Sequence, residues 1–347
     1  SFVPIKLIRA SEVGGAVRDA LLKTKAKDRD WVVVGSSPEE MIEKGFKPIG
    51  KDFPVFLHPS TKEEYALART ERKTGHGYHG FNFYYGKEVT LEEDLSRRDF
   101  TINAIAKDDS GRLIDPFNGI TDIKNKIFRH VSDAFSEDPL RAIRLARFRT
   151  YDHLKDFVIS KETKKLINTI INLGEIGTLS KNRIWAETER ALSSNNPSIY
   201  FETLIEYEMH VFHFKDLKNS GCSSVNDPSI RWAELEINNS FLIGKDLPIP
   251  NSFINASQTL KALSKIPTNP DEECLLGILK NVRLERDEDL IKHLVCLPQL
   301  KETKKLILEL VEGMKNTDFS ILSKVSNEHI EEEKIKLLKQ VIENLNE

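Results

Sequence analysis

The chain has 347 residues, of which 39% are hydrophobic and 30% are charged. This length predicts two to three domains, and the apolar fraction is sufficient for a folded core. The formal net charge of −3 excludes bulk positive charge as a means of binding nucleic acid, so any RNA contact must come from local basic patches. The cysteines, Cys222, Cys274 and Cys296, form no C-x-x-C pair, which fits a reducing compartment without a zinc or disulfide framework. Without a long apolar run or a signal-peptide pattern, we expect a cytoplasmic protein that does not contact membranes.

The first 35 residues combine a glycine pair with two aspartates. Gly14 and Gly15 predict a turn that opens a helix and lets backbone N–H groups approach a phosphate, with Arg18 available as a charged clamp. Asp28 and Asp30 precede an apolar strand, and side chains two residues apart on a strand project together. Adjacent carboxylates repel unless a cation lies between them, and such ligands suit Mg²⁺. This pattern indicates metal-assisted nucleotidyl transfer, although D-x-D also occurs in glycosyltransferases that bind a sugar nucleotide.

The segments that follow predict the rest of a small sheet. Strands are expected at residues 31–34, 55–58 and 64–69, with a helix after the N-cap Ser37. The strand at 64–69 would lie beside the one that follows Asp30, which makes Glu64 a candidate third carboxylate. An exposed strand glutamate without a role is an equally good interpretation of Glu64.

Two stretches carry a resemblance to a known family. The first is GGAVRD at residues 14–19 followed by DRDWVVVG at residues 28–35, and the second is RRDFTINA at residues 97–104. Together they resemble the class II tRNA nucleotidyltransferase and bacterial poly(A) polymerase family, in the version of gammaproteobacterial CCA-adding enzymes. The resemblance implies an α+β fold with three parts. These are an N-terminal nucleotidyltransferase α/β head with a small mixed sheet over residues 1–134, a helical neck over 135–200, and a helical body and tail over 201–347.

The resemblance also assigns roles around the second stretch. It implies that Arg98 holds the triphosphate while Asp99 and Asn103 brace the site. The basic, aromatic segment 69–86 is expected to be a mobile loop near the substrate phosphates.

A helix is predicted from Pro139, with Asp138 as its N-cap. The resemblance makes Asp138 and Arg141 the nucleobase-selecting pair. A carboxylate acceptor beside a guanidinium donor matches the pairing edges of cytosine and adenine and mismatches those of uracil and guanine. Arg144 and Arg147 extend a basic stripe at three-residue spacing, which we also assign to nucleotide binding; the alternative is a capped helix with a solvated basic face.

The C-terminal half reads as helices, and the resemblance thins there. Related enzymes often carry a phosphohydrolase domain with a His-Asp dyad, but the sequence contains no His-Asp pair, and residues 231–236 stand where it is expected. Lysines such as Lys301, Lys304 and Lys305 could contact the tRNA elbow or simply be solvated.

The sequence therefore predicts a Mg²⁺-dependent CCA-adding enzyme, with Asp28 and Asp30 as metal ligands and catalytic residues. The expected partners are the tRNA 3′ end, CTP and ATP, and the expected state is a monomer. A poly(A) polymerase, an enzyme that adds only CC or only A, and a non-catalytic tRNA-binding relic remain alternatives.

Overall fold

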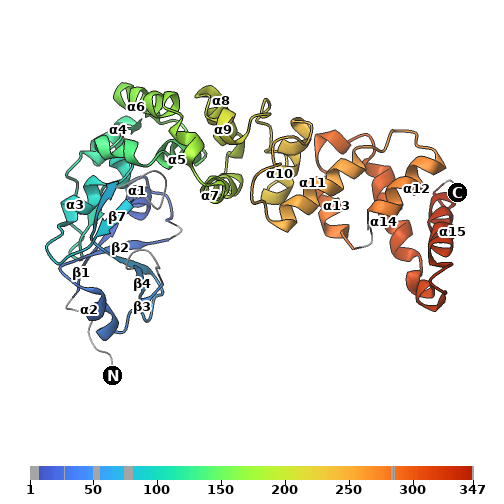
Figure 1. Cartoon of the computed structure of the whole chain (residues 1–347), viewed down its shortest axis with the longest axis horizontal. Helices are drawn as coiled ribbons and strands as arrows, with labels where there is room; N and C mark the ends of the chain where they lie inside the picture. The colour runs from blue at the N-terminus through green and yellow to red at the C-terminus, as the bar shows by residue number, and fades with distance from the viewer. Residues whose placement is uncertain are drawn as a thin grey trace. The chain divides into compact units, whose positions relative to one another are not determined.

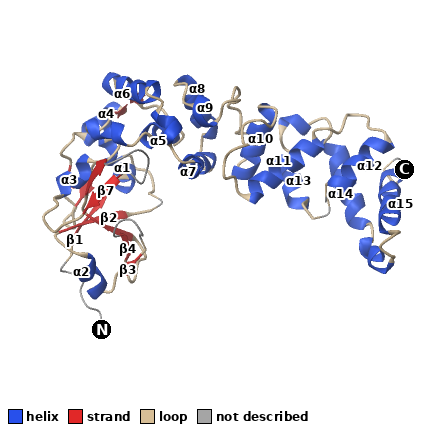
Figure 2. Cartoon of the chain, viewed as in Figure 1, coloured by secondary structure: helices blue, strands red, loops and turns tan. Residues whose placement is uncertain are grey.

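The computed structural model describes residues 8–26, 28–49, 55–73, 81–282, 284 and 286–345. It divides into two compact units, one of residues 1–184 and 207–212 and the other of residues 185–206 and 213–347. These units do not coincide with the expected boundaries at residues 134 and 200, so the division into head, neck and body remains a prediction. Among the described residues, all strands lie in the first unit, and the second unit is helical (Figures 1 and 2).

The first unit is built on a seven-stranded mixed sheet with the order β3-β4-β5-β2-β1-β8-β9. Its strands are β1 (Arg9–Val13), β2 (Asp30–Val34), β3 (Lys47–Pro48), β4 (Val55–Leu57), β5 (Glu64–Leu67), β8 (Ala106–Lys107) and β9 (Leu113–Ile114). Neighbours are antiparallel except β2 and β5, which run parallel with Asp30 opposite Glu64. The expected mixed sheet, and the placement of Glu64 beside the aspartate strand, are confirmed.

The first strand, β1, contains a buried charged residue. Glu12 is buried in this strand, and its carboxylate accepts hydrogen bonds from Arg29 (Nε–Oε1, 2.9 Å) and pairs with Lys107 (Nζ–Oε2, 2.9 Å). A buried carboxylate is tolerated when it is paired and hydrogen-bonded. The ion pairs also tie β1 to the Asp28–Asp30 segment, because Arg29 lies between those two aspartates.

Helices and short helical turns surround the sheet. They are α1 (Gly15–Leu21), α2 (Pro38–Glu43), α3 (Leu91–Ser96), η2 (Thr101–Asn103), α4 (Gly119–Asn125), η3 (Asp133–Glu137), α5 (Leu140–Phe148), α6 (Lys161–Asn172), η4 (Glu175–Thr178) and α9 (His210–His213). Two small ladders complete the unit, β6 (Thr70–Lys73) with β7 (Phe81–Tyr84) and β10 (Ile127–Phe128) with β11 (Val158–Ile159). Ser37 caps α2 with the reciprocal contact from Glu40, as the sequence predicts.

The two faces of the sheet pack against separate apolar clusters. Val32 belongs to one cluster and its neighbour Val33 to the other, because successive strand residues point to opposite faces. Phe100, fully buried, packs edge-on against Phe128, Phe135 and Phe148 and so joins the sheet region to α5.

The second unit begins within α7 (Lys181–Leu192), before which Ser180 Oγ accepts a hydrogen bond from the Arg183 backbone N–H (3.4 Å). It continues with α8 (Pro197–Glu206), α10 (Pro228–Asn238), α11 (Asn251–Leu263), α12 (Glu272–Asn281), α13 (Glu288–Leu294), η5 (Pro298–Leu300), α14 (Lys304–Asn316), η6 (Phe319–Lys324) and α15 (Ile330–Glu343). One apolar cluster runs from α10 to α15. Within the described ranges, none of these helices is long and apolar enough to cross a membrane.

Two glycines of the helices make a stability test. A Cβ on Gly119 would lie 2.2 Å from the Thr101 backbone oxygen, whereas one on Gly277 would meet nothing within 4 Å. We expect Gly119→Ala to destabilise the protein by about 1–3 kcal/mol through overpacking. Gly277→Ala should instead stabilise α12 by up to about 1 kcal/mol. Thermal unfolding of both variants tests this, and a melting temperature for Gly119→Ala at or above the wild-type value would contradict it.

Candidate active site

The site begins at the turn between β1 and α1. Gly14 has φ of 73°, a conformation that favours glycine, and a Cβ there would lie 3.0 Å from Nη1 of Arg98. Gly15 follows at the first position of α1, where a Cβ would lie 3.4 Å from Nη2 of Arg18. The glycines therefore admit two guanidinium groups close to the backbone at the end of β1.

Arg98 lies where the sequence placed a triphosphate-binding residue. Its Nη2 donates to Asp94 (3.2 Å), while Nε is buried and has no hydrogen-bond partner among the described residues. A buried donor without a partner is costly, so a ligand oxygen there would be favourable. The charge of Arg98 also lowers the pKa of Asp30, so the guanidinium acts electrostatically on one of the two aspartates.

Asp28, Asp30 and Glu64 are all exposed. The pKa of Asp30 is raised above its ordinary value, mainly because the surrounding protein excludes water from part of the carboxylate. The positive charge of Arg98 lowers this pKa, and the negative charge of Asp28 raises it further. Two carboxylates that repel each other in this way fit a divalent cation. Nothing in the described part of the chain brings three or more His, Cys, Asp or Glu side chains together as a metal site. Glu64 as a third carboxylate therefore stays a prediction, supported only by its register opposite Asp30.

Arg18 is not a free phosphate clamp in this structure. It is buried, its Nε donates to Asp19 (2.8 Å), and its Nη1 donates to Asn103 (2.6 Å). Asn103 in turn donates to Asp99 (3.0 Å), which accepts from Arg144 Nε (2.8 Å). This chain of contacts joins α1, η2 and α5, and it supports bracing roles for Asp99 and Asn103.

The expected basic stripe on α5 is largely buried, which corrects its interpretation as an open basic face. Arg141 is 8% exposed and Arg147 is 5% exposed. The guanidinium carbons of Arg18, Arg144 and Arg147 lie 5.5, 5.2 and 4.4 Å from the ring centroid of Phe148. Cation–π attraction and the Asp99 ion pair stabilise this cluster. Nucleotide binding by Arg144 and Arg147 stays a prediction, and their observed contacts are internal.

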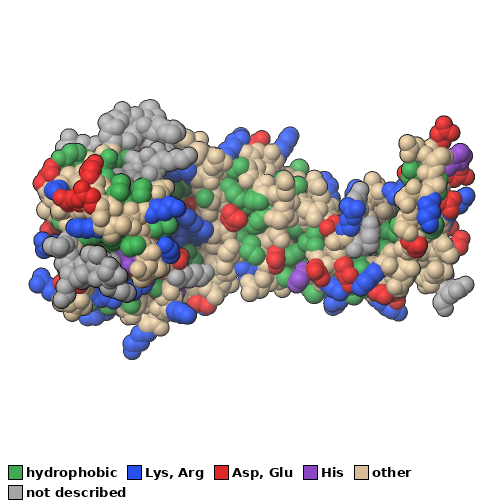
Figure 3. All heavy atoms as spheres, turned by 90° about the horizontal axis from the view of Figure 1, so that it is seen from below, with side chains coloured by type: hydrophobic (Ala, Val, Ile, Leu, Met, Phe, Trp, Pro, Cys, Tyr) green, Lys and Arg blue, Asp and Glu red, His purple; other side chains and the backbone are tan. Residues whose placement is uncertain are grey.

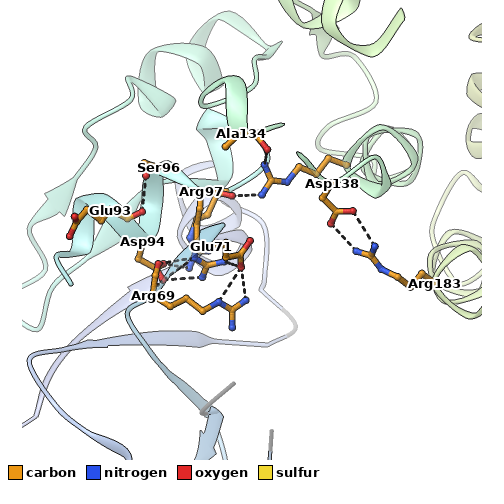
Figure 4. A network of polar contacts seen from close by, with 11 residues as sticks. Arg69, Glu71, Glu93, Asp94, Ser96, Arg97, Ala134, Asp138 and Arg183 are labelled. Carbon is orange, nitrogen blue, oxygen red and sulfur yellow. Dashed lines mark hydrogen bonds and ion pairs between the residues drawn. The ribbon is translucent and has the colours of Figure 1, made fainter. Parts of the chain in front are cut away.

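A second ion-pair cluster lies around the fully buried Asp94 (Figure 4). Its Oδ1 accepts from Nη2 of Arg97 (2.9 Å) and from the Arg69 backbone N–H (3.2 Å), and Oδ2 accepts from Arg98. Glu71 bridges Arg69 (Nη2, 3.0 Å) and Arg97 (Nη1, 2.7 Å). Burial and the like charge of Arg97 lower the pKa of Arg69 to about 10. This cluster fixes the base of the segment expected to be a mobile loop; residues 74–80 of that segment lie outside the described residues.

Asp138 and Arg141, the expected nucleobase-selecting pair, are joined by no side-chain hydrogen bond or ion pair in the described part of the chain. Asp138 lies before α5 in an extended conformation, and its Oδ1 accepts from the Leu140 backbone N–H (3.2 Å). Arg183 binds both its oxygens, with Nη1–Oδ1 at 3.1 Å and Nη2–Oδ2 at 2.8 Å (Figure 4). The Arg141 guanidinium instead donates to the backbone oxygens of Ala134 (2.7 Å) and Arg97. Asp138 lies outside the helix that carries Arg141, because α5 begins at Leu140, directly after Pro139.

Sequence reasoning missed three residues that organise the site, namely Asp94, Glu71 and the Arg183 partner of Asp138. For Asp94 a signal existed, since Arg97 and Arg98 stand three and four residues later, the spacing of ion pairs on a helix. Glu71 also pairs with Arg69 two residues before it, but its contact with Arg97 spans 26 residues and that of Arg183 with Asp138 spans 45, and local spacing gives no signal for these two.

Residues 231–236, where a His-Asp dyad was sought, form part of α10. Arg231 donates to the backbone oxygens of Leu192 (2.6 Å) and Ser194 (2.8 Å), and Glu234 accepts from the Ser224 backbone N–H (3.0 Å). These hydrogen bonds connect α10 to backbone groups of the second unit. Lys and Arg side chains are interspersed with Asp and Glu over the face in Figure 3, in keeping with the small net charge.

Comparison with known proteins finds matching family models and similar folds. A family model described as "Poly A polymerase head domain" matches residues 11–129, and one described as "Probable RNA and SrmB- binding site of polymerase A" matches residues 156–220. Similar solved structures include a Bacillus stearothermophilus CCA-adding enzyme in complex with CTP, with 24% identity, a TM-score of 0.71, and coverage of 98% of this chain and 90% of that chain. A tRNA-processing enzyme in an apo form has 25% identity, a TM-score of 0.60 and 96% coverage of each chain. A CCA-adding enzyme with ATP has 22% identity, a TM-score of 0.63, and coverage of 96% of this chain and 87% of that chain.

The mixed sheet, the glycine turn with Arg98 and the paired aspartates define a nucleotidyltransferase head followed by a helical body. With the head and RNA-binding models matching in order, the chain belongs to the class II CCA-adding enzyme and poly(A) polymerase family.

The bracing role of Asp99 predicts an acid dependence of stability. Burial alone would raise the pKa of Asp99, but the charge of Arg144 and hydrogen bonds from Asn103 and Arg144 outweigh it and hold the pKa well below its usual range. The contribution of Asp99 is therefore fully present above the unfolded value of about 3.9 and is lost as the pH falls towards the folded value. Asp99→Asn should destabilise the protein at pH 7, with a difference from wild type that shrinks below pH 4. Asp109→Asn, at an exposed turn, is the control. A pH-independent difference in melting temperature would contradict this assignment.

Proposed function

We propose that this protein adds C, C and A to the 3′ end of tRNA from CTP and ATP without a nucleic-acid template, releasing pyrophosphate. One observation carries the proposal: Arg98 lies at the glycine turn with a buried Nε that has no partner among the described residues, and its charge acts on Asp30 of the exposed aspartate pair. A cation site and a triphosphate site thus adjoin. The similar structures in complex with CTP and with ATP support the choice of substrates.

The roles of the side chains follow from their chemistry. Asp28 and Asp30 would hold divalent metal, with Glu64 as a further carboxylate on the neighbouring strand. When bound, Mg²⁺ supplies Lewis-acid stabilisation of the reacting phosphate and lowers the pKa of the attacking 3′-hydroxyl. Arg98 would orient the triphosphate through its free donor, and Asp94 sets the position of that guanidinium through an ion pair.

Base selection would be performed by Asp138 with a guanidinium donor beside it. Arg183 holds both Asp138 oxygens, whereas Arg141 would have to give up backbone oxygens to reach a base. Burial lowers the pKa of Arg141, and the carboxylates of Asp99 and Asp138 oppose this, so Asp138 lies within electrostatic range of Arg141. Arg141 and Arg183 are therefore both candidates for the guanidinium that donates to the base, and substituting each in turn distinguishes between them.

The direct test is primer extension with Mg²⁺ on tRNAs that end at the discriminator base, at C or at CC. Each acceptor is offered the four nucleoside triphosphates singly and CTP with ATP together. We expect ordered addition of C, C and A followed by a stop. Addition of only CC or only A would assign a partial enzyme, and binding of tRNA without any addition would favour the relic.

A poly(A) polymerase of the same family is the second candidate, because the matching head model carries that description. It predicts unlimited addition of A and acceptance of many RNA 3′ ends in the same assay.

Substitution of the aspartate pair tests the metal assignment. Asp30→Asn should lower kcat by about a thousandfold or more, since each 1.36 kcal/mol of lost transition-state stabilisation is tenfold in rate. Asp28→Asn should act similarly, and Asp109→Asn should not. Activity of Asp30→Asn within a few fold of wild type would contradict the assignment.

Asp138→Ala should admit UTP and GTP while leaving metal dependence unchanged, with discrimination reduced by tenfold or more because the mismatched base no longer leaves buried groups unpaired. Arg183→Ala and Arg141→Ala then identify the donor: the variant that loses discrimination along with Asp138→Ala is the base-reading arginine. Retained selectivity in Asp138→Ala would overturn the role of Asp138.

A further inference from the structure

The second unit contains a pocket that the proposed reaction does not use. It lies between α10, α11 and the loop that joins them, and it has a volume of about 300 Å³. The two helices pack against each other (Figure 1). Its walls are mainly apolar and include Trp232, Phe241 and Ile249. Leu242 and Ile254 also line it and are 56% and 38% exposed, so its rim presents apolar surface to solvent. A small apolar cavity with a few polar groups has the character of a ligand site.

Two side chains that line the pocket each have one buried polar atom without a hydrogen-bond partner among the described residues. Glu236 is 7% exposed and its Oε1 has no hydrogen-bond partner, and Ser257 is 9% exposed with the same deficit at Oγ, among the described residues. Gly244 lines the pocket close by, where a Cβ would lie 2.7 Å from that Glu236 oxygen and 3.0 Å from the Trp232 ring. Gly244 therefore packs so closely against Glu236 and Trp232 that a larger residue there would press on this acceptor.

The charges at the pocket favour one class of ligand. Lys245 and Lys261 line it, and the Lys261 ammonium group lies 5.3 Å from the Phe241 ring centroid. Two lysines would repel a simple organic cation and attract an anion, while Glu236 would accept from an N–H donor. A flat ring with an N–H donor at one end and a phosphate at the other satisfies the aromatic wall, the acceptor and the lysines together.

We propose that this pocket binds a nucleoside monophosphate with an amino-bearing base, its amino group donating to Glu236 and its phosphate facing Lys245 and Lys261. The nucleotide can be free or an unpaired residue of an RNA chain, since both present the same chemistry. Uracil fits poorly, because the carbonyl oxygens that flank its N–H would face the Glu236 carboxylate.

Photolabelling of the full-length protein with 8-azidoadenosine 5′-monophosphate tests the proposal, with the labelled peptides mapped by mass spectrometry. Labelling within residues 232–261 is expected, distinct from any label in the head. Glu236→Gln and Lys261→Ala should each reduce it by tenfold or more. Lys265→Ala, at an exposed residue outside the pocket, is the matched control. Circular dichroism and melting of each variant confirm the fold, and Ser257→Ala is a second variant if Glu236→Gln unfolds.

Competition identifies the source of the nucleotide. If a single-stranded pentanucleotide protects the pocket from photolabelling more strongly than AMP does, the natural ligand is RNA. The reverse result assigns the pocket to a free nucleotide. Either result supports nucleotide binding in the pocket. Label confined to residues of the head, equal loss in Lys265→Ala, or protection by UMP as effective as by AMP would overturn the proposal.

The affinity for adenosine, which carries no phosphate, gives an independent readout. Burial raises the pKa of Glu236 to about 7, opposed by the Gly244 N–H and by Lys261; Lys245 is the other charged side chain in the pocket. Only the ionised carboxylate accepts at both oxygens, so affinity should rise about tenfold from pH 6 to pH 8 as the ionised fraction grows. Glu236→Gln should abolish this change, and a pH-independent affinity in the wild type would contradict the role of Glu236.

Discussion

Two buried carboxylates, Asp94 and Asp99, hold the arginines of the first unit in place. Asp94 is fully buried, and Arg97 and Arg98 pair with it, while Asp99 links Arg144 to Asn103 and, through Asn103, to Arg18. Removing one partner of a buried ion pair costs about 3–5 kcal/mol because it leaves an uncompensated charge. The head therefore depends on matched charges as much as on its apolar clusters. This explains how so many cations gather in one unit of a chain whose net charge is negative.

Much of the fold could be predicted from local patterns. The capping box at Ser37, the apolar strand after Asp30 and the hairpin that carries Glu64 each have a signal within a few residues, and the structure has them. β1 was harder, because the burial of Glu12 depends on Arg29 and Lys107, which only the folded sheet brings to it.

The site shows where local reasoning fails. Short motifs indicate the residue types, and Arg98 acts electrostatically on Asp30. The direction of each guanidinium could not be predicted, because it depends on distant partners: Arg18 turns to Asn103, Arg141 to backbone oxygens, and Arg183 to Asp138. The three-residue spacing of Asp138 and Arg141 would also fit one helical face. The helix begins only after Pro139, however, so Asp138 lies outside it.

The contact between Arg141 and the backbone oxygen of Arg97 links two regions that have separate tasks in the proposed function. Arg97 precedes Arg98, the candidate triphosphate ligand, and Arg141 lies on the helix that follows Asp138. A shift of one backbone segment therefore alters the hydrogen bonds available to the other. In thermodynamic terms, the proposed roles would give triphosphate binding and base recognition a coupling free energy, and linkage would then require each to change the affinity of the other by the same factor.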